Sequence, residues 1–221
     1  MSSKQKTIFL LLGLPFFITF IERYLIKPLV SMFSLPDTSI YLLKVGSISL
    51  VLFAICSFLG NTYGLDITKK LKKALTIMFI TLLTMCYVFL FSLKVRGFFD
   101  NLAVIHLINW VISVFREEFI LRGIIQTKAS SILKGRFLKI PNFIWLSTIA
   151  FSLWHLVNLT IWPWQTVLLQ MIGVIPAGIV LGLIREKTGN ALLTYLLHIC
   201  GDLLFFSLYL LLFGKLFFTL F

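Results

Sequence analysis

Long apolar runs separated by short polar connections make up most of this 221-residue chain. The runs long enough to cross a bilayer, or nearly so, are 8–33, 41–60, 74–93, 101–126, 142–158, 165–184 and 191–213. Because a helix of about 20 apolar residues spans the hydrocarbon core, this pattern predicts an all-α transmembrane bundle. The last run could extend to Phe221, so we expect seven or eight spans.

Composition supports one integral-membrane domain over residues 1–221. Hydrophobic residues make up 59% of the chain and charged residues only 13%, whereas soluble domains are about 25% charged. There is no polar stretch long enough to form a separate soluble domain. Lys4 and Lys6 precede the first apolar run without a cleavage pattern after it, so we expect a retained helix rather than a signal peptide.

The distribution of the net charge of +12 indicates the orientation of the chain in the membrane and does not point to a nucleic-acid partner. Basic residues gather in the connections 61–73, 127–140 and 185–190, as cytoplasmic loops of membrane proteins require. They do not line one recognition surface. The distribution predicts a cytoplasmic N-terminus, although Lys94 and Arg96 would then lie outside.

Five ionisable side chains fall within the predicted spans. They are Glu117, Glu118, His155, His198 and Asp202. At the centre of a membrane helix a charged group costs about 3 kcal/mol or more, and such groups usually face the bundle interior and mark a functional site. We therefore expect function to reside in this set.

Helical geometry separates the two neighbouring glutamates. Glu118 and Arg122 have the i,i+4 spacing of an ion pair, whereas Glu117 is rotated by about 140° from Arg122 and lacks that partner. An unpaired carboxylate in an apolar bundle accepts a proton more readily, which suits a general base. We expect Glu118 to be structural and Glu117 to be reactive. A salt-bridge cluster with no chemistry is an equally good interpretation of this segment alone.

Two histidines occupy similar helical settings. Phe151 shares a helix face with His155, and His198 shares one with Asp202. Either histidine alone could simply bond a neighbouring helix. Together with the glutamates they form a set able to activate water between the fourth, fifth and seventh spans. The chain has no His-Glu-x-x-His or Gly-x-Ser-x-Gly motif.

The three motifs together resemble the CPBP intramembrane protease family. They are Glu117-Glu118-x-x-x-Arg122, Phe151-x-x-x-His155 and His198-x-x-x-Asp202, and they occur in family order on separate helices. This family contains type II CAAX prenyl endopeptidases and bacterial Abi and bacteriocin self-immunity proteins. The resemblance covers about residues 100–210, the expected protease core.

The resemblance implies roles for these residues. Glu117 and His155 would activate a water for attack on a peptide carbonyl, and His198 and Asp202 would assist. Glu118 and Arg122 complete the catalytic set, and Phe151 would border the imidazole and the substrate.

The cofactor stays open, because members of the family are described both as metalloproteases and as metal-independent glutamate peptidases. A divalent metal such as zinc would be held by His155, His198 and Asp202. Eukaryotic-type members resemble one another in having Asn where Asp202 stands. An ionised carboxylate would repel an oxyanion, so this difference favours a metal ligand or an orienter of His198. A protonated Asp202 would restore the donor role.

The leading hypothesis is an intramembrane endopeptidase of a bacterial cell membrane, with its site open to the cytoplasm. By family analogy, it would act on a membrane-associated bacteriocin, pheromone precursor or leader peptide. One alternative is a non-catalytic scaffold or bacteriocin-immunity protein that binds a peptide or partner. A small transporter with a proton relay is a weaker alternative, because the paired half-helices of such proteins are not evident.

Two further features concern packing. Gly173, Pro176, Gly178 and Gly182 in the sixth span predict close helix packing or a kink. The predicted loops also place Glu117 and His198 at roughly 11–15 Å of helix from the cytoplasmic side, but His155 at roughly 21 Å. Helix tilt, or an interfacial first turn at 142–146, would reconcile these depths.

Overall fold

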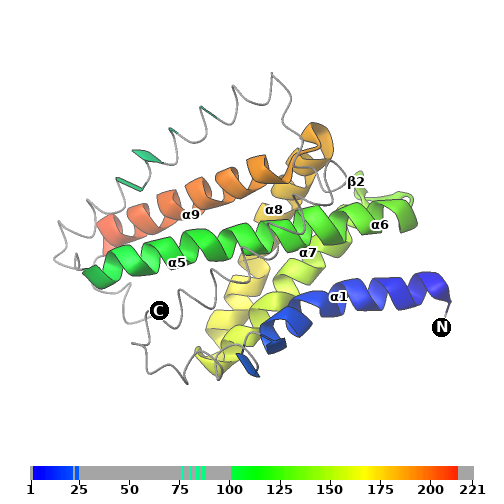
Figure 1. Cartoon of the computed structure of the whole chain (residues 1–221), viewed down its shortest axis with the longest axis horizontal. Coiled ribbons are helices and arrows are strands. Elements are labelled where there is room, and N and C mark those ends of the chain that lie inside the picture. The colour runs from blue at the N-terminus through cyan, green and yellow to red at the C-terminus, as the bar shows by residue number, and fades with distance from the viewer. Residues whose placement is uncertain are drawn as a thin grey trace.

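A computed structural model describes residues 2–21, 23–24, 76, 80, 83–84, 86–87 and 101–213, with side chains given for 110–208 in the last range. Figure 1 shows the described elements as a bundle of helices. The predicted spans 41–60 and 74–93 lie outside the described residues, apart from the few positions between 76 and 87.

The bundle contains α-helices, two non-α helical segments and one small hairpin. In chain order they are α1 (Ser3–Ile21), α5 (Asn101–Glu118), the π-helix η3 (Phe119–Gln126), α6 (Thr127–Ile132), β1 (Arg136–Phe137), β2 (Ile140–Pro141), α7 (Asn142–Trp154), the 3₁₀-helix η4 (His155–Thr160), α8 (Trp164–Thr188) and α9 (Ala191–Phe213). The all-α prediction is confirmed for the described residues.

Four described segments are long and apolar enough to cross a membrane. They are Ser3–Ile21, Asn142–Thr160, Trp164–Thr188 and Ala191–Leu208. The chain is therefore an integral membrane protein. The first segment begins five residues before the predicted run 8–33, and the predicted span 101–126 is helical but is not among the four. The total of seven or eight spans and the orientation stay predictions.

The prediction of a loop over residues 127–140 was wrong for residues 127–132, because these residues form the helix α6. The apolar pattern fades after Gln126, but the chain there bonds its own backbone: Ser130 Oγ donates to Thr127 O at 2.8 Å and Ser131 Oγ to Lys128 O at 2.7 Å. Glu117 therefore lies fifteen residues before the end of its helical stretch, and His155 lies thirteen residues after the start of α7. Counted from these helix ends, Glu117 and His155 lie at similar distances, whereas His198 lies only seven residues after the start of α9.

Two tight connections set the directions of the helices that follow. β1 and β2 pair in antiparallel fashion, with Phe137 opposite Ile140, and the two residues between them have positive φ angles of 51° and 64°. This is the backbone of a two-residue hairpin turn. Gly189 ends α8 in the left-handed conformation at φ 68°, where glycine carries no steric penalty. Asn190 then accepts from the backbone N–H of Leu193 at 2.9 Å and caps the start of α9.

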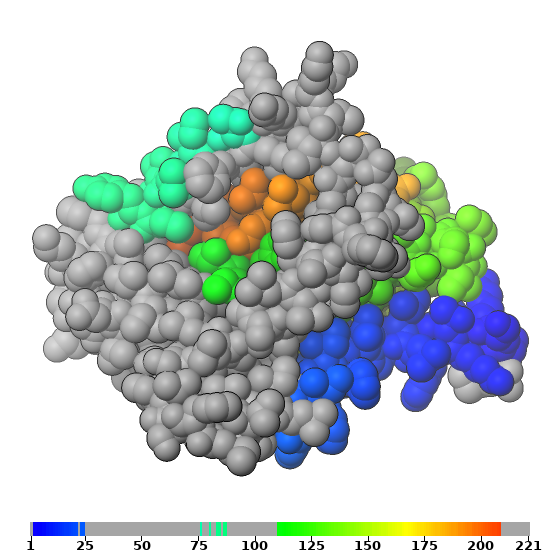
Figure 2. All heavy atoms as spheres, viewed as in Figure 1, coloured from blue at the N-terminus to red at the C-terminus, as the bar shows by residue number. Residues whose placement is uncertain are grey.

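The larger core cluster joins α1, η3, α6 and α7. Its buried members are Leu11, Ile120, Leu121, Ile125, Ala129, Leu146, Ala150, Phe151 and Trp154. α1 lies along α7 in Figure 1, and in Figure 2 its atoms form one edge of the molecule. Its outward side chains, such as Phe9 and Leu10, are each 71% exposed, as suits a surface that faces lipid.

Close contact between α7 and α8 depends on two of the predicted small residues. A methyl group on Gly182 would lie 2.6 Å from Ile144 Cγ2, and one on Gly178 would lie 2.9 Å from Thr148 Cγ2. Both distances are too short for carbon atoms, so a larger residue would push the helices apart. At Gly173, by contrast, no described atom lies within 4 Å. The packing prediction is confirmed for Gly178 and Gly182 but not for Gly173.

We predict that Gly182→Ala destabilises the protein by about 1–3 kcal/mol, because fully buried Ile144 cannot move aside without repacking α7. Gly173→Ala on the same helix is the matched control, and it should be neutral or slightly stabilising because alanine favours helix. Thermal unfolding of the detergent-purified variants measures the difference. Equal midpoints for the two variants would contradict this account of the interface.

Candidate active site

Glu118 is the centre of a buried polar cluster between the α5–η3 junction and α9. Its Oε1 accepts a hydrogen bond from His198 Nδ1 at 3.0 Å, and its Oε2 lies 3.5 Å from Arg122 Nε. Glu118 and Arg122 are each 0% exposed. The ion pair predicted from the i,i+4 spacing is confirmed. The contact with His198, eighty residues away in the chain, was not predicted.

Asp202 completes the second motif pair. Its Oδ2 lies 3.4 Å from His198 Nε2, as the shared helix face predicted. His198 therefore has a carboxylate at each ring nitrogen, and its side chain is only 9% exposed. The Asp202 side chain is 35% exposed and lies at the more open side of the cluster. This contact supports Asp202 as an orienter of His198, one of the roles left open by the sequence.

Arg122 connects the cluster to α7. Its Nη1 donates to Ser147 Oγ at 3.3 Å, and its guanidinium carbon lies 5.8 Å from the centroid of the Phe151 ring. Ser147 is fully buried and in turn donates to Ile144 O at 3.0 Å. Arg122 thus compensates the charge of Glu118 and connects the continuous helical stretch of α5 and η3 to α7.

Phe151 brings the two histidines to one place. Its ring packs edge-on against His155 at a centroid distance of 4.9 Å and against His198 at 5.7 Å. Phe151 is 2% exposed, so it is a buried wall between the two imidazoles. The predicted pairing with His155 is confirmed, while the contact with His198 adds a link that spacing could not show.

His155 lies where α7 changes into the 3₁₀-helix η4. Its Nδ1 is 2.9 Å from Phe151 O, and since a carbonyl only accepts, Nδ1 carries the proton in this bond. In the neutral ring Nε2 then keeps its lone pair. His155 is half-buried. Its second nitrogen therefore suits binding of a water or a metal.

Glu117 differs from its neighbour in both burial and partners. It is half-buried, and within the described part of the chain no hydrogen bond or ion pair engages its carboxylate. It is nevertheless close enough to His198 and Asp202 to act on them electrostatically. The geometry thus agrees with the expectation that the Glu118 carboxylate is engaged in structural contacts and the Glu117 carboxylate is not.

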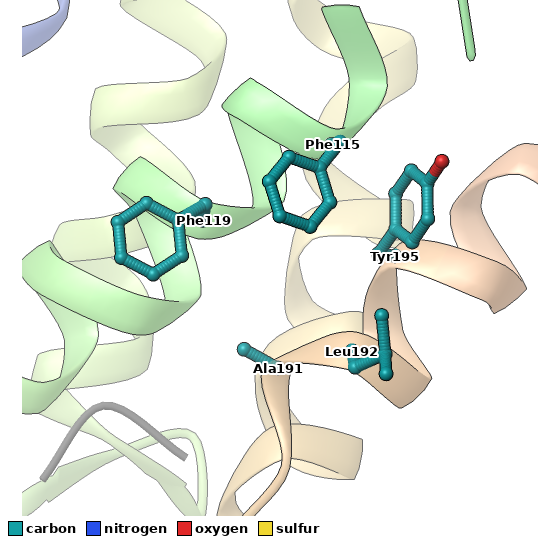
Figure 3. Close-up of a pocket in the computed structure, with 5 residues that line it drawn as sticks. All are labelled: Phe115, Phe119, Ala191, Leu192 and Tyr195. Atoms are coloured by element: carbon teal, nitrogen blue, oxygen red, sulfur yellow. The ribbon is translucent and has the colours of Figure 1, made fainter. Parts of the chain in front are cut away.

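An apolar pocket adjoins the cluster between α5–η3 and α9. It is lined by Phe115, Phe119, Ala191, Leu192 and Tyr195, and Figure 3 shows the rings of Phe115 and Tyr195 next to each other. These two rings pack edge to face at 5.1 Å. The pocket holds about 10 Å³, which is close to the space of one water. The pocket is therefore too small for a peptide side chain.

The predicted metal ligands do not assemble into one site. Among the described residues, no three His, Cys, Asp or Glu side chains form a group that could hold a metal ion. His198 also has Glu118 at one nitrogen and Asp202 at the other, which leaves it poorly placed as a ligand. The set His155, His198 and Asp202 does not fit a three-donor metal centre here.

Trp154 is a site neighbour that sequence reasoning missed. Its ring lies 5.5 Å from the guanidinium carbon of Arg116, and its Nε1 donates to Thr19 Oγ1 at 2.9 Å. The one available signal was its position directly before His155. The partner on α1 is too far away in the chain to be predicted from spacing.

Comparison with known proteins agrees with the motif assignment. No curated protein and no solved structure was found to match the chain. A family model does match, over residues 99–204, and this range contains every residue of the cluster described above. The family is described as type II CAAX prenyl endopeptidase Rce1-like, a family of membrane-embedded proteases. The resemblance seen in the motifs is thus confirmed, and residues 99–204 of this chain match the model of an Rce1-like domain.

Proposed function

We propose that the protein is an intramembrane endopeptidase in which Glu117 and His155 activate a water molecule. One observation supports this above all others. Glu118 is held by Arg122 and His198, whereas the adjacent Glu117 has no described partner. A scaffold needs only the compensated carboxylate of Glu118, because an uncompensated carboxylate near a membrane interior is costly. A general base, by contrast, requires an uncompensated carboxylate such as that of Glu117.

The described bonds support a separate task for each group in the proposed mechanism. One O–H of the water would donate to Glu117 and the other to His155 Nε2, the ring nitrogen left free by the bond to Phe151 O. Proton transfer to Glu117 frees the oxygen to attack the peptide carbonyl. His198 lies between two carboxylates, and in its protonated form it would stabilise the developing oxyanion by its charge. Glu117 then returns its proton to the leaving amine, and a carboxyl and an amine result.

The substrate we propose is a membrane-associated peptide or precursor of the bacteriocin, pheromone or leader class. The apolar surface of the described helices supports a substrate that reaches the site from the bilayer. Comparison of secreted and membrane-bound peptides from cells expressing the chain or its Glu117→Gln variant, by mass spectrometry, would identify the cleaved peptide. Identical peptide profiles in the two strains would favour the scaffold or immunity function.

We predict opposite behaviour for the two adjacent glutamates. Glu117→Gln should lower kcat/KM by about 10²- to 10⁴-fold with an unchanged unfolding midpoint, because it removes a general base and no described contact. Glu118→Gln should destabilise the protein by about 3–5 kcal/mol, because it leaves buried Arg122 without a counter-charge. Cleavage of internally quenched peptides in proteoliposomes, with thermal unfolding in detergent, measures both effects.

The matched control is Glu186→Gln, which alters an exposed carboxylate near the end of α8 and away from the cluster. It should retain both activity and stability. If Glu117→Gln cleaves peptides at the wild-type rate, Glu117 is not the base and the proposed mechanism is wrong.

We further propose the glutamate-type mechanism over the metal-dependent one. The support comes from the donor set, since His198 is enclosed by Glu118 and Asp202 and the described residues form no three-donor group. We predict that incubation with a strong chelator leaves peptide cleavage unchanged, and that metal analysis of the active protein finds less than one equivalent. Loss of activity with the chelator, restored by zinc, would show that the metal-dependent mechanism applies.

A further inference from the structure

The N-terminal helix α1 lies outside the Rce1-like segment 99–204, yet α1 and the residues just after it bond the chain at both ends of the 3₁₀-helix that carries His155. Thr19 Oγ1 accepts from Trp154 Nε1 at 2.9 Å, immediately before η4 begins. Arg23 Nη2 donates to Thr160 Oγ1 at 3.0 Å, at the last residue of η4. Thr19 and Arg23 are four residues apart, so one side of the chain in and just after α1 brackets all of η4.

η4 needs support of this kind. A 3₁₀-helix has poorer hydrogen-bond geometry than an α-helix and occurs in short pieces. None of the six residues of η4 is buried, so packing alone does not hold the segment. Asn158 in the middle of η4 donates to Gln170 Oε1 of α8 at 2.9 Å, and the two side-chain bonds from the α1 region add restraints at the two ends of the segment.

Trp154 also links α1 to the segment that holds Glu117. Its ring lies 5.5 Å from the guanidinium carbon of Arg116, the residue directly before Glu117, and it directly precedes His155. Trp154 is only 5% exposed and belongs to the core cluster with Leu11 of α1. A change in the position of this ring would therefore affect both groups that are proposed to activate water.

We infer that Thr19 and Trp154 are positioning residues, through which α1 sets the place of His155 relative to Glu117. This inference rests on the proposed function. The hydroxyl of Thr19 is well suited to the task. It donates to Pro15 O at 3.0 Å, and this bond orients its oxygen so that a lone pair is available to the Trp154 N–H. Figure 1 shows the end of α1 beside the region where α7 passes into η4.

The test compares Thr19→Val with Thr19→Ser and Thr7→Val. Valine has the shape of threonine but no hydroxyl, so Thr19→Val should lower kcat by about ten- to a hundredfold while KM changes less than about twofold. Thr19→Ser keeps the acceptor and should restore activity. Thr7 makes the same type of back-bond within α1, to Ser3 O at 3.1 Å, but has no described contact with η4. Thr7→Val should be fully active.

A double-mutant cycle separates positioning from general loss of stability. Trp154→Phe keeps an aromatic ring and removes the N–H, so it should reproduce the loss of kcat seen in Thr19→Val. The double variant should be no worse than either single one, because both break the same bond. The loss of kcat should be larger than the loss of stability measured by the unfolding midpoint can explain. The backbone amides of residues 155–160 should exchange faster in all three variants.

The outcomes separate the two proposals. If the wild-type protein cleaves peptides and Thr19→Val does so equally well, the positioning role is wrong and the proposed function stands. The role is also wrong if kcat falls only in proportion to the unfolding midpoint, or if Thr7→Val loses as much activity. If the wild-type protein cleaves no peptide, the proposed function fails. In that case amide exchange still tests the positioning role: an unchanged exchange rate of residues 155–160 in Thr19→Val would show that Thr19 does not restrain η4.

Discussion

Compensation of the Glu118 charge is the constraint on which the rest of the site depends. The side chain is fully buried in a protein whose helices are apolar on nearly every face, so an unbalanced negative charge there would be costly. Balance requires Arg122 from the same helical stretch and His198 from α9. Arg122 is itself buried and needs Ser147 of α7. One carboxylate thus determines which faces of three helices point inward.

This balance also explains how two adjacent glutamates can differ in function. Consecutive residues of a helix point about 100° apart, so only one of them can face Arg122 and His198. The other points to a different neighbourhood, where it is half-buried and senses His198 and Asp202 without a direct bond. The same local geometry that pairs Glu118 with Arg122 and His198 therefore leaves Glu117 without a described partner. The two glutamates could exchange environments only if the helical stretch formed by α5 and η3 rotated about its axis.

The sequence predicted those parts of the site that arise within one helix. The pairs Glu118–Arg122, Phe151–His155 and His198–Asp202 all follow from i,i+4 geometry, and the structure contains each of them. Contacts between helices were beyond this reasoning, because spacing along one helix carries no information about the rotation of its neighbour. The bond from His198 to Glu118 and the contact of Phe151 with His198 belong to this class.

The fold shows the same division between local and long-range information. The apolar runs predicted the helices α7, α8 and α9 to within a few residues at most ends, because burial in lipid and packing demand apolar side chains throughout. The extension to Ile132 was missed, because polar residues past Gln126 can remain helical once their side chains bond the backbone. Hydropathy records the membrane boundary and not the end of the helix.

Two departures from α-helical geometry flank the site, and they explain why the family segment alone is an incomplete description of it. The π-helix η3 begins directly after Glu118, and the 3₁₀-helix η4 begins at His155. Such segments are less stable than α-helix and commonly occur at functional sites. They persist when surrounding contacts hold them, as Arg122 with Ser147 does for η3. For η4 such contacts come from Gln170 of α8, which accepts a hydrogen bond from Asn158, and from Thr19 and Arg23, which precede residue 99. The N-terminal helix is therefore a structural part of the site that its motif residues form.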